Sequence, residues 1–175
     1  NASGYDPIIH LKSGRRGLEI YTEGGELMIP SPEGEAITPK TIAVRSMTKY
    51  GSANVQPSDL DGVTIFAQAE GGSIRQFVYD WEQESMVANS LVIRVPDLIR
   101  DPIAMASASD AFGLKLDLLC VANSDGVIGA LCWNRDQQVA AWSEWTTTGS
   151  ILALTTIGSD ILAVLRRAGD GPSFR

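Results

Sequence analysis

The densest group of side chains that could do chemistry is the acidic stretch Asp80-Trp81-Glu82-Gln83-Glu84. Paired carboxylates supply the acid and the base in glycosidases, and carboxylates also bind Ca²⁺. A calcium loop would carry aspartates at alternate positions ahead of a glycine, and that spacing is absent. We interpret the stretch as a solvated turn after a strand, with acid–base chemistry at Asp80, Glu82 or Glu84 as the competing hypothesis.

Two further loops contain charged side chains. Asn134-Arg135-Asp136-Gln137 could pair Arg135 with Asp136 or with a neighbouring structural unit, or it could be an exposed turn. Ser13-Gly14-Arg15-Arg16-Gly17 could contact phosphate, but it lacks the spacing and the Lys-Ser/Thr pair of a P-loop. His10 has no evident partner in the sequence. We therefore predict surface turns in both loops and a surface or packing position for His10.

The tryptophans and cysteines fit positions in strands. Trp142 and Trp145 are three residues apart, so a strand would point them to opposite faces. One is predicted to be buried, and the other to be exposed or at an interface, where it could stack on a sugar or anchor a partner. Cys120 and Cys132 lie on the two arms of a hairpin around Asp125-Gly126. A two-residue turn there would put the thiols on opposite faces, so we predict two core cysteines without a disulfide.

Composition and missing motifs exclude several classes of function. The chain lacks a nucleophile elbow and the HExxH, CxxC and dinucleotide-binding motifs. One histidine and two cysteines are too few for a His-rich metal site or a disulfide scaffold. With 14 Lys+Arg against 21 Asp+Glu, the net charge of −7 argues against gripping nucleic acid by its phosphates. The sequence predicts no enzyme, no cofactor, no metal site and, since its apolar runs are short, no membrane span.

Short strands separated by turn signals dominate the chain, and no window of three helical turns has persuasive helical spacing. The segments Lys49–Asp59 and Asp80–Ser90 are predicted as a loop and as a possible helical turn. The predicted strands are Pro7–Lys12, Leu18–Thr22, Glu26–Ile29, Thr41–Met47, Val63–Gln68, Ser73–Tyr79, Leu91–Val95, Ile103–Ala108, Leu114–Ala122, Val127–Trp133, Val139–Thr146, Ile151–Thr156 and Ile161–Arg166.

A weak internal repeat suggests an architecture. The hairpin segment 65–83 aligns without gaps to 119–137, and a third copy ends at the Asp170-Gly171 turn. Hairpins that recur every ~45–50 residues are typical of four-stranded propeller blades. We predict an all-β fold of antiparallel, four-stranded, blade-like sheets in a partial β-propeller, with a sandwich as the alternative. The approximate units are 7–95, 100–147 and an incomplete 149–175, and we expect a fragment of a longer polypeptide because three blades do not close a ring.

Several motifs resemble those of one family of phage proteins. They are Tyr50-Gly51-Ser52, the run Ile74-Arg75-Gln76-Phe77 with Tyr79, Asp80 and Glu82, Val87-Ala88-Asn89-Ser90-Leu91, and the run from Trp133 to Trp142. Together they resemble the tail nozzle or tail tubular protein B-like β-propellers of short-tailed bacteriophages, also described as head–tail stabilisation proteins. The family-motif residues, for which a structural role is expected, are Tyr50, Gly51, Tyr79, Asp80, Glu82, Asn89, Arg135, Gln137 and Trp142.

The resemblance implies a structural protein of the virion, made in the host cytoplasm and assembled into the phage tail. Such proteins form a ring, expected to be a hexamer, beside the adaptor and the tail fibres. The ring helps to retain the genome and conducts it during ejection. DNA would pass through without specific binding, and an acidic wall would repel its phosphates. The alternative is a glycan- or receptor-binding propeller that uses Trp81, Trp142 and Trp145, and a hydrolase ranks last.

Overall fold

The computed structural model describes residues 6–31, 36–40, 42–70, 72–113, 116–134, 137–167 and 173–174. These residues form four antiparallel sheets and a single 3-10 turn, Ala111–Gly113. No helix in this part of the chain is long and apolar enough to cross a membrane. The all-β prediction is therefore confirmed. Arg135, Asp136, Thr41, Leu114 and the Asp170-Gly171 turn lie outside the described residues.

Each sheet is built from strands that follow one another directly in the chain. The first sheet contains β1 (Ile8–Gly14), β2 (Gly17–Thr22), β3 (Glu26–Pro30) and β4 (Arg45–Thr48). The second contains β5 (Ser58–Leu60), β6 (Val63–Ala67), β7 (Ile74–Asp80) and β8 (Ser85–Ser90). The third contains β9 (Pro102–Ala108), β10 (Asp117–Asn123), β11 (Val127–Asn134) and β12 (Val139–Thr146). The fourth contains β13 (Ser150–Ile157), β14 (Asp160–Arg166) and β15 (Ser173–Phe174).

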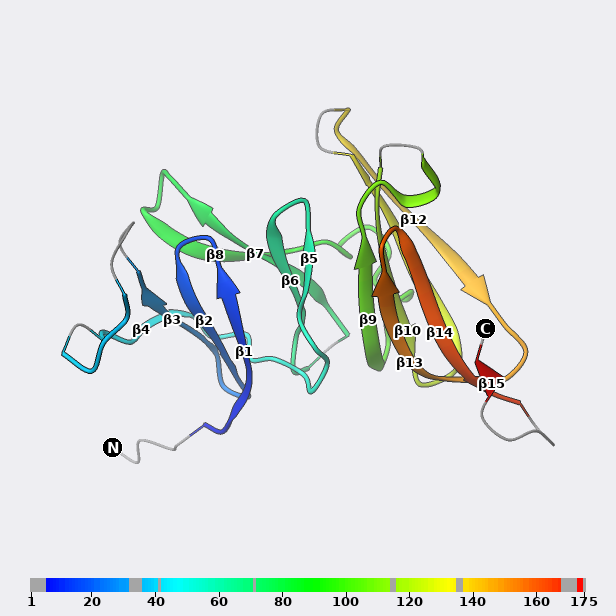
Figure 1. Cartoon of the computed structure of the whole chain (residues 1–175), viewed down its shortest axis with the longest axis horizontal. Helices are drawn as coiled ribbons and strands as arrows, with labels where there is room; N and C mark the ends of the chain where they lie inside the picture. The colour runs from blue at the N-terminus through cyan, green and yellow to red at the C-terminus, as the bar shows by residue number, and fades with distance from the viewer. Residues whose placement is uncertain are drawn as a thin grey trace.

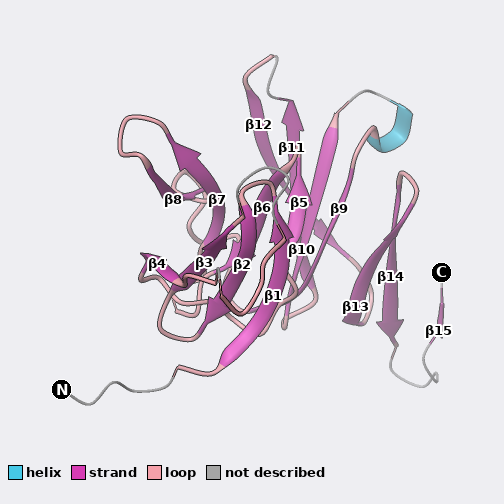
Figure 2. Cartoon of the chain, turned by 60° about the vertical axis from the view of Figure 1, so that its left-hand side comes forward, coloured by secondary structure: helices cyan, strands magenta, loops and turns pink. Residues whose placement is uncertain are grey.

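The sheets also follow one another in space. The β1–β4 sheet lies at one end of the molecule and the β13–β15 sheet at the other (Figures 1 and 2). The first strands β5, β9 and β13 lie side by side, and the last strands β4 and β8 are neighbours. Chain order and spatial order therefore agree from one sheet to the next.

A separate apolar core fills each of the three junctions between neighbouring sheets. The first core contains Tyr21, Met28, Phe66, Phe77, Met86 and Ala88. The second contains Val55, Leu60, Ile65, Ala67, Ile74, Val92, Ile99, Met105, Leu119, Val121 and Leu131. The third contains Ala111, Leu118, Cys120 and Ala130, against which Leu154 and Ile161 pack.

The inner strands have continuous apolar runs because both of their faces are covered. Successive side chains of a strand point to opposite faces, so β6 sends Phe66 to the first core, and Ile65 and Ala67 to the second. In the same way, β10 sends Leu119 to the second core and Cys120 to the third. A sheet buried on both sides needs apolar side chains at every position of its central strands.

Several strand predictions are wrong or incomplete. The expected helical turn in Asp80–Ser90 is instead a tight turn followed by β8, and Leu91–Val95 forms turns rather than a strand. The predicted loop Lys49–Asp59 includes the first residues of β5. The unit 7–95 contains two complete sheets, because β5 is too short and too polar to show as a strand in the sequence.

The predicted placement of the two cysteines is also wrong. Cys120 pairs with Ala130, and Cys132 pairs with Leu118. Residues two apart on one strand share a face, so the thiols lie on the same face in a diagonal arrangement. The turn is longer than two residues, since the last pair in this ladder is Ala122 with Ile128, and this shifts the register by one. Both cysteines are free, as predicted, and Cys120 is a core residue.

Candidate functional site at the sheet junctions

Two buried carboxyl groups occupy the junction between the first two sheets. Glu19 in β2 is 5% exposed and Glu26 in β3 is fully buried. Tyr21 pairs with Glu26 across the two strands and lies two residues from Glu19, so all three side chains share the face that covers the second sheet. The Tyr21 hydroxyl donates a hydrogen bond of 2.7 Å to Glu19 Oε2. The first junction thus combines the polar contact between Tyr21 and Glu19 with the apolar contact between the Tyr21 and Phe66 rings.

Burial controls the ionisation of these groups. It raises the pKa of Glu19, although hydrogen bonds from Tyr21 and Thr64 oppose the shift. It also raises the pKa of Glu26, against the opposing effect of the Thr48 hydroxyl and the backbone N–H of Tyr50, both of which donate to Glu26 Oε2. The pKa of Tyr21 rises because the ring is buried and because Glu19 is adjacent.

Arg75 of β7 connects this junction to Tyr50, one of the family-motif residues. Its Nε donates to Gln68 Oε1 at 2.6 Å, and its Nη1 donates to the Ala88 carbonyl at 2.7 Å. The guanidinium carbon lies 3.4 Å from the centre of the Tyr50 ring, which is a cation–π contact. Since Tyr50 donates its backbone N–H to Glu26, this one residue links β3 to β7.

Gly51 is required by the backbone at this point. Its φ of 71° lies in the left-handed region, and a Cβ there would overlap the backbone oxygen of Glu23. The neighbouring Ser52 donates its N–H to the Thr22 carbonyl at 2.8 Å. The Tyr50-Gly51-Ser52 motif therefore attaches the connecting segment to the first hairpin.

The acidic stretch after β7 is a tight turn, as expected. Asp80 Oδ1 accepts the backbone N–H groups of Glu82 and Gln83 at 2.8 and 3.2 Å, and Asp80 Oδ2 accepts Gln83 Nε2 at 3.1 Å. The carboxylate of Asp80 is thus engaged in shaping the turn. No group of three or more His, Cys, Asp or Glu side chains that could hold a metal ion occurs among the described residues.

An aromatic and cationic cluster lies beside the same turn. The Tyr79 and Trp81 rings are 4.9 Å apart in an edge-to-face arrangement. The Arg16 guanidinium, from the β1–β2 turn, lies 3.7 Å from the centre of the Tyr79 ring and 4.7 Å from that of Trp81. Tyr79 is half-buried, whereas Trp81 is 76% exposed. Asn89 is exposed and pairs with Gln76 in the β7–β8 ladder.

Trp142 performs the corresponding linking role at the second junction. Its Nε1 donates to the Leu91 carbonyl at 2.9 Å, and its ring packs against the second core. Trp145 is 39% exposed, as predicted for one of the two tryptophans, whereas Trp142 is half-buried rather than fully buried. Gln137 donates its backbone N–H to Asn134 Oδ1 at 2.9 Å and so belongs to the β11–β12 turn.

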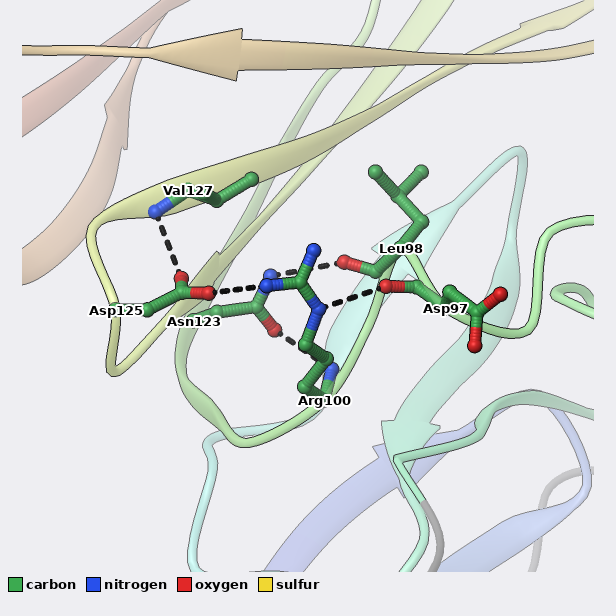
Figure 3. A network of polar contacts seen from close by, with 6 residues as sticks. All are labelled: Asp97, Leu98, Arg100, Asn123, Asp125 and Val127. Carbon is green, nitrogen blue, oxygen red and sulfur yellow. Dashed lines mark hydrogen bonds and ion pairs between the residues drawn. The ribbon is translucent and has the colours of Figure 1, made fainter.

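A polar network fixes the segment that connects the second and third sheets (Figure 3). Asn123, which is 1% exposed, donates Nδ2 to the Leu98 carbonyl at 2.9 Å and accepts the Arg100 backbone N–H at 3.1 Å. The Arg100 side chain donates to the Asp97 carbonyl and forms a 2.7 Å ion pair with Asp125. The β10–β11 turn is thereby attached to the connecting segment.

Polar side chains also link the first strands of all four sheets. Lys12 of β1 pairs with Asp59 of β5 at 2.6 Å. The hydroxyls of Ser58 and Ser107 are 2.6 Å apart and join β5 to β9. Thr156 of β13 donates its hydroxyl to the Ser107 carbonyl of β9 at 2.7 Å. The partners in these three contacts are 47, 49 and 49 residues apart, and each contact joins the first strands of two successive sheets.

Within the described part of the chain, the family-motif residues are distributed over two junctions, two turns and, for Asn89, an exposed position of β8, and they do not meet in one site. Sequence reasoning missed Glu19, Glu26, Asn123 and the role of Arg75. A signal for the first two was available, because Glu19 alternates with Tyr21, which pairs with Glu26 across the Thr22–Gly25 turn. Their position makes these groups structural links between sheets.

No family model matches the chain, and no curated protein sequence matches it. Among solved structures, a chain in the complex of a variant of S. cerevisiae Dbp5 bound to Nup159, a Gle1 variant, IP6 and ADP is similar with a TM-score of 0.51 and 11% identity. The similarity covers 95% of this chain and 42% of that chain, so the present chain spans less than half of its length. At this identity the likeness concerns the fold alone.

Proposed function

We propose that the chain is a structural part of a phage tail nozzle-like ring, in which its sheets act as successive blades of a partial β-propeller. The observation that carries the proposal is the agreement of chain order and spatial order in four antiparallel sheets, with a core at every junction. Such sheets are the units from which propellers are built. The motif resemblance supplies the phage tail as the place of assembly.

The contacts of the family-motif residues support a structural role. Tyr50 and Gly51 attach a connecting segment at the first junction, and Trp142 links β12 to the second sheet. Asp80 and Gln137 shape hairpin turns through backbone hydrogen bonds. Contacts of this kind are expected of residues that hold blades together. None of the contacts named here pairs a nucleophile with a base.

The proposed ring is a homo-oligomer, expected to be a hexamer, that contacts an adaptor and tail fibres and lets DNA pass without specific binding. The net charge of −7 supports this last part, because an acidic wall does not retain phosphates. The exposed Trp81 favours one second candidate, a saccharide-binding module.

An immunoblot of purified phage particles tests the tail proposal. Virions of the phage that encodes the chain are banded on a density gradient and probed with antibodies raised against residues 6–167. We expect the polypeptide to sediment with the particles at a fixed copy number relative to the portal. Its recovery in the soluble lysate alone, with none in particles that contain the portal, would contradict the proposal.

A further inference from the structure

We infer that the cluster of Arg16, Tyr79 and Trp81 is a binding site for a neutral saccharide, in which one pyranose ring stacks on Trp81. The inference is independent of the tail-ring proposal. It begins with the position of Trp81, which is 76% exposed at the tip of the β7–β8 hairpin. An exposed indole has a large apolar face that remains in water unless a ligand covers it.

The surrounding turn holds Trp81 in a defined position. Asp80 accepts three hydrogen bonds from Glu82 and Gln83, and Glu84 closes the turn with a φ of 51°. The Tyr79 ring supports the indole edge-to-face at 4.9 Å. A ligand therefore meets a platform that is already ordered, which lowers the entropic cost of binding.

Arg16 supplies the directional part of the site. Its guanidinium lies over both the Tyr79 ring and the Trp81 ring, and its backbone carbonyl accepts the Ser31 N–H at 3.0 Å. Among the described residues no carboxylate forms an ion pair with it. A guanidinium carries five N–H donors, so several remain available to ligand oxygens beside the platform.

The chemistry of the cluster favours a neutral sugar. A pyranose has an apolar C–H face for the indole and hydroxyl groups that accept from Arg16. Glu82 and Glu84 are exposed in the same turn and can accept hydrogen bonds from hydroxyls. The same carboxylates would repel an anionic sugar.

The size of the apolar surface favours a sugar over a protein. Trp81 is the only large exposed hydrophobic residue of the described β7–β8 hairpin, 74–90. A protein interface of standard size covers about 800 Å² on each partner and usually has a broader apolar centre. One indole bordered by charged residues has the footprint of a single sugar ring.

A glycan array tests the inference. The full chain is applied to an array of bacterial surface polysaccharides together with glucose, galactose, rhamnose and N-acetylglucosamine oligomers, with sialylated and uronic-acid glycans as anionic probes. We expect binding to neutral glycans, and isothermal titration with the best of them should show a loss of about tenfold or more for Trp81→Ala and a smaller loss for Arg16→Ala. Ile93→Ala, which alters an apolar side chain that is 77% exposed and lies outside the cluster, is the matched control and should bind within about twofold of the wild type.

Three results would overturn the inference. They are an array without neutral binders, binding that Trp81→Ala leaves unchanged, and capture of a protein through Trp81 with no saccharide bound. The unfolding midpoint of Trp81→Ala, measured in urea, distinguishes loss of the site from loss of the fold, and we expect it to match the wild type because the indole is exposed. None of these results bears on whether the chain enters a ring.

Discussion

The replacement of Asn123 by alanine gives the sharpest test of how the second and third sheets are joined. The Asn123 side chain is buried, and its amide makes two hydrogen bonds to the backbone of the connecting segment, at Leu98 and Arg100. Alanine removes both and leaves a carbonyl and an N–H without partners. Each unpaired group costs about 1–3 kcal/mol according to its burial. Because residue 100 is itself exposed, we expect a total loss of about 2–3 kcal/mol.

The matched control is Arg100→Ala, which removes the ion pair with Asp125 and the exposed hydrogen bond to the Asp97 carbonyl, both shown in Figure 3. The two side chains of this pair are 55% and 39% exposed, and surface ion pairs contribute about 0–1 kcal/mol. Urea unfolding followed by tryptophan fluorescence measures both variants. With a slope of about 2 kcal/mol per molar urea, Asn123→Ala should lower the midpoint by about 1–1.5 M and Arg100→Ala by less than about 0.5 M.

Either of two results would refute this reasoning. One is an Asn123→Ala midpoint close to that of the wild type, which would mean that water or a local shift replaces both hydrogen bonds. The other is an Arg100→Ala loss as large as that of Asn123→Ala, which would move the stabilisation from the buried amide to the exposed ion pair.

Three further predictions concern the other links. The pKa of Glu26 is raised in the fold, so the contribution of Glu26 to stability is present at acidic pH and is lost as pH rises through the folded pKa. In urea titrations between pH 4 and pH 7, Glu26→Gln should therefore become more stable relative to the wild type as pH rises. A stability difference that does not change with pH would contradict this prediction. Gly51→Ala should cost at least about 1–2 kcal/mol for its left-handed backbone, with more from the overlap with Glu23, and an unchanged thermal midpoint would be the wrong outcome. Trp142→Phe should lower the free energy of unfolding by about 1–2 kcal/mol, because the Leu91 carbonyl loses its donor. An unchanged midpoint in the same urea assay would contradict this.

Strands with a strong local signal could be predicted from the sequence. The hairpin of β2 and β3 and the hairpin of β6 and β7 occur close to their predicted bounds, since each has apolar runs on both sides of glycines. The different exposures of Trp142 and Trp145 also follow directly from the alternation of a strand.

Features that depend on tertiary contacts could not be predicted. The register of Cys120 and Cys132 depends on the length of the β10–β11 turn, where the Asn123 side chain is hydrogen-bonded to the connecting segment. The three-residue strand β5 is ordered by its pairing with β6 and by the contacts of Ser58 and Asp59 with neighbouring first strands. Such contacts cannot be predicted from a local pattern of hydrophobicity.

The buried carboxyl groups are a further example. Isolated glutamates are expected on the surface, whereas Glu19 and Glu26 are buried where the second sheet packs against the first. Their partners Thr48, Thr64 and Arg75 come from three different strands or adjoining segments. A sequence can suggest the face on which a glutamate lies, but not that another sheet covers it.

Electron microscopy of the purified polypeptide tests the central claim most directly. Negative-stain class averages, with the particle mass measured in parallel by mass photometry, show whether copies of the protein assemble around a central opening. We expect closed rings with a channel, with a mass near that of six copies if the ring is the expected hexamer. A monodisperse monomer at every concentration up to about 100 μM, with no ring in the images, would contradict it.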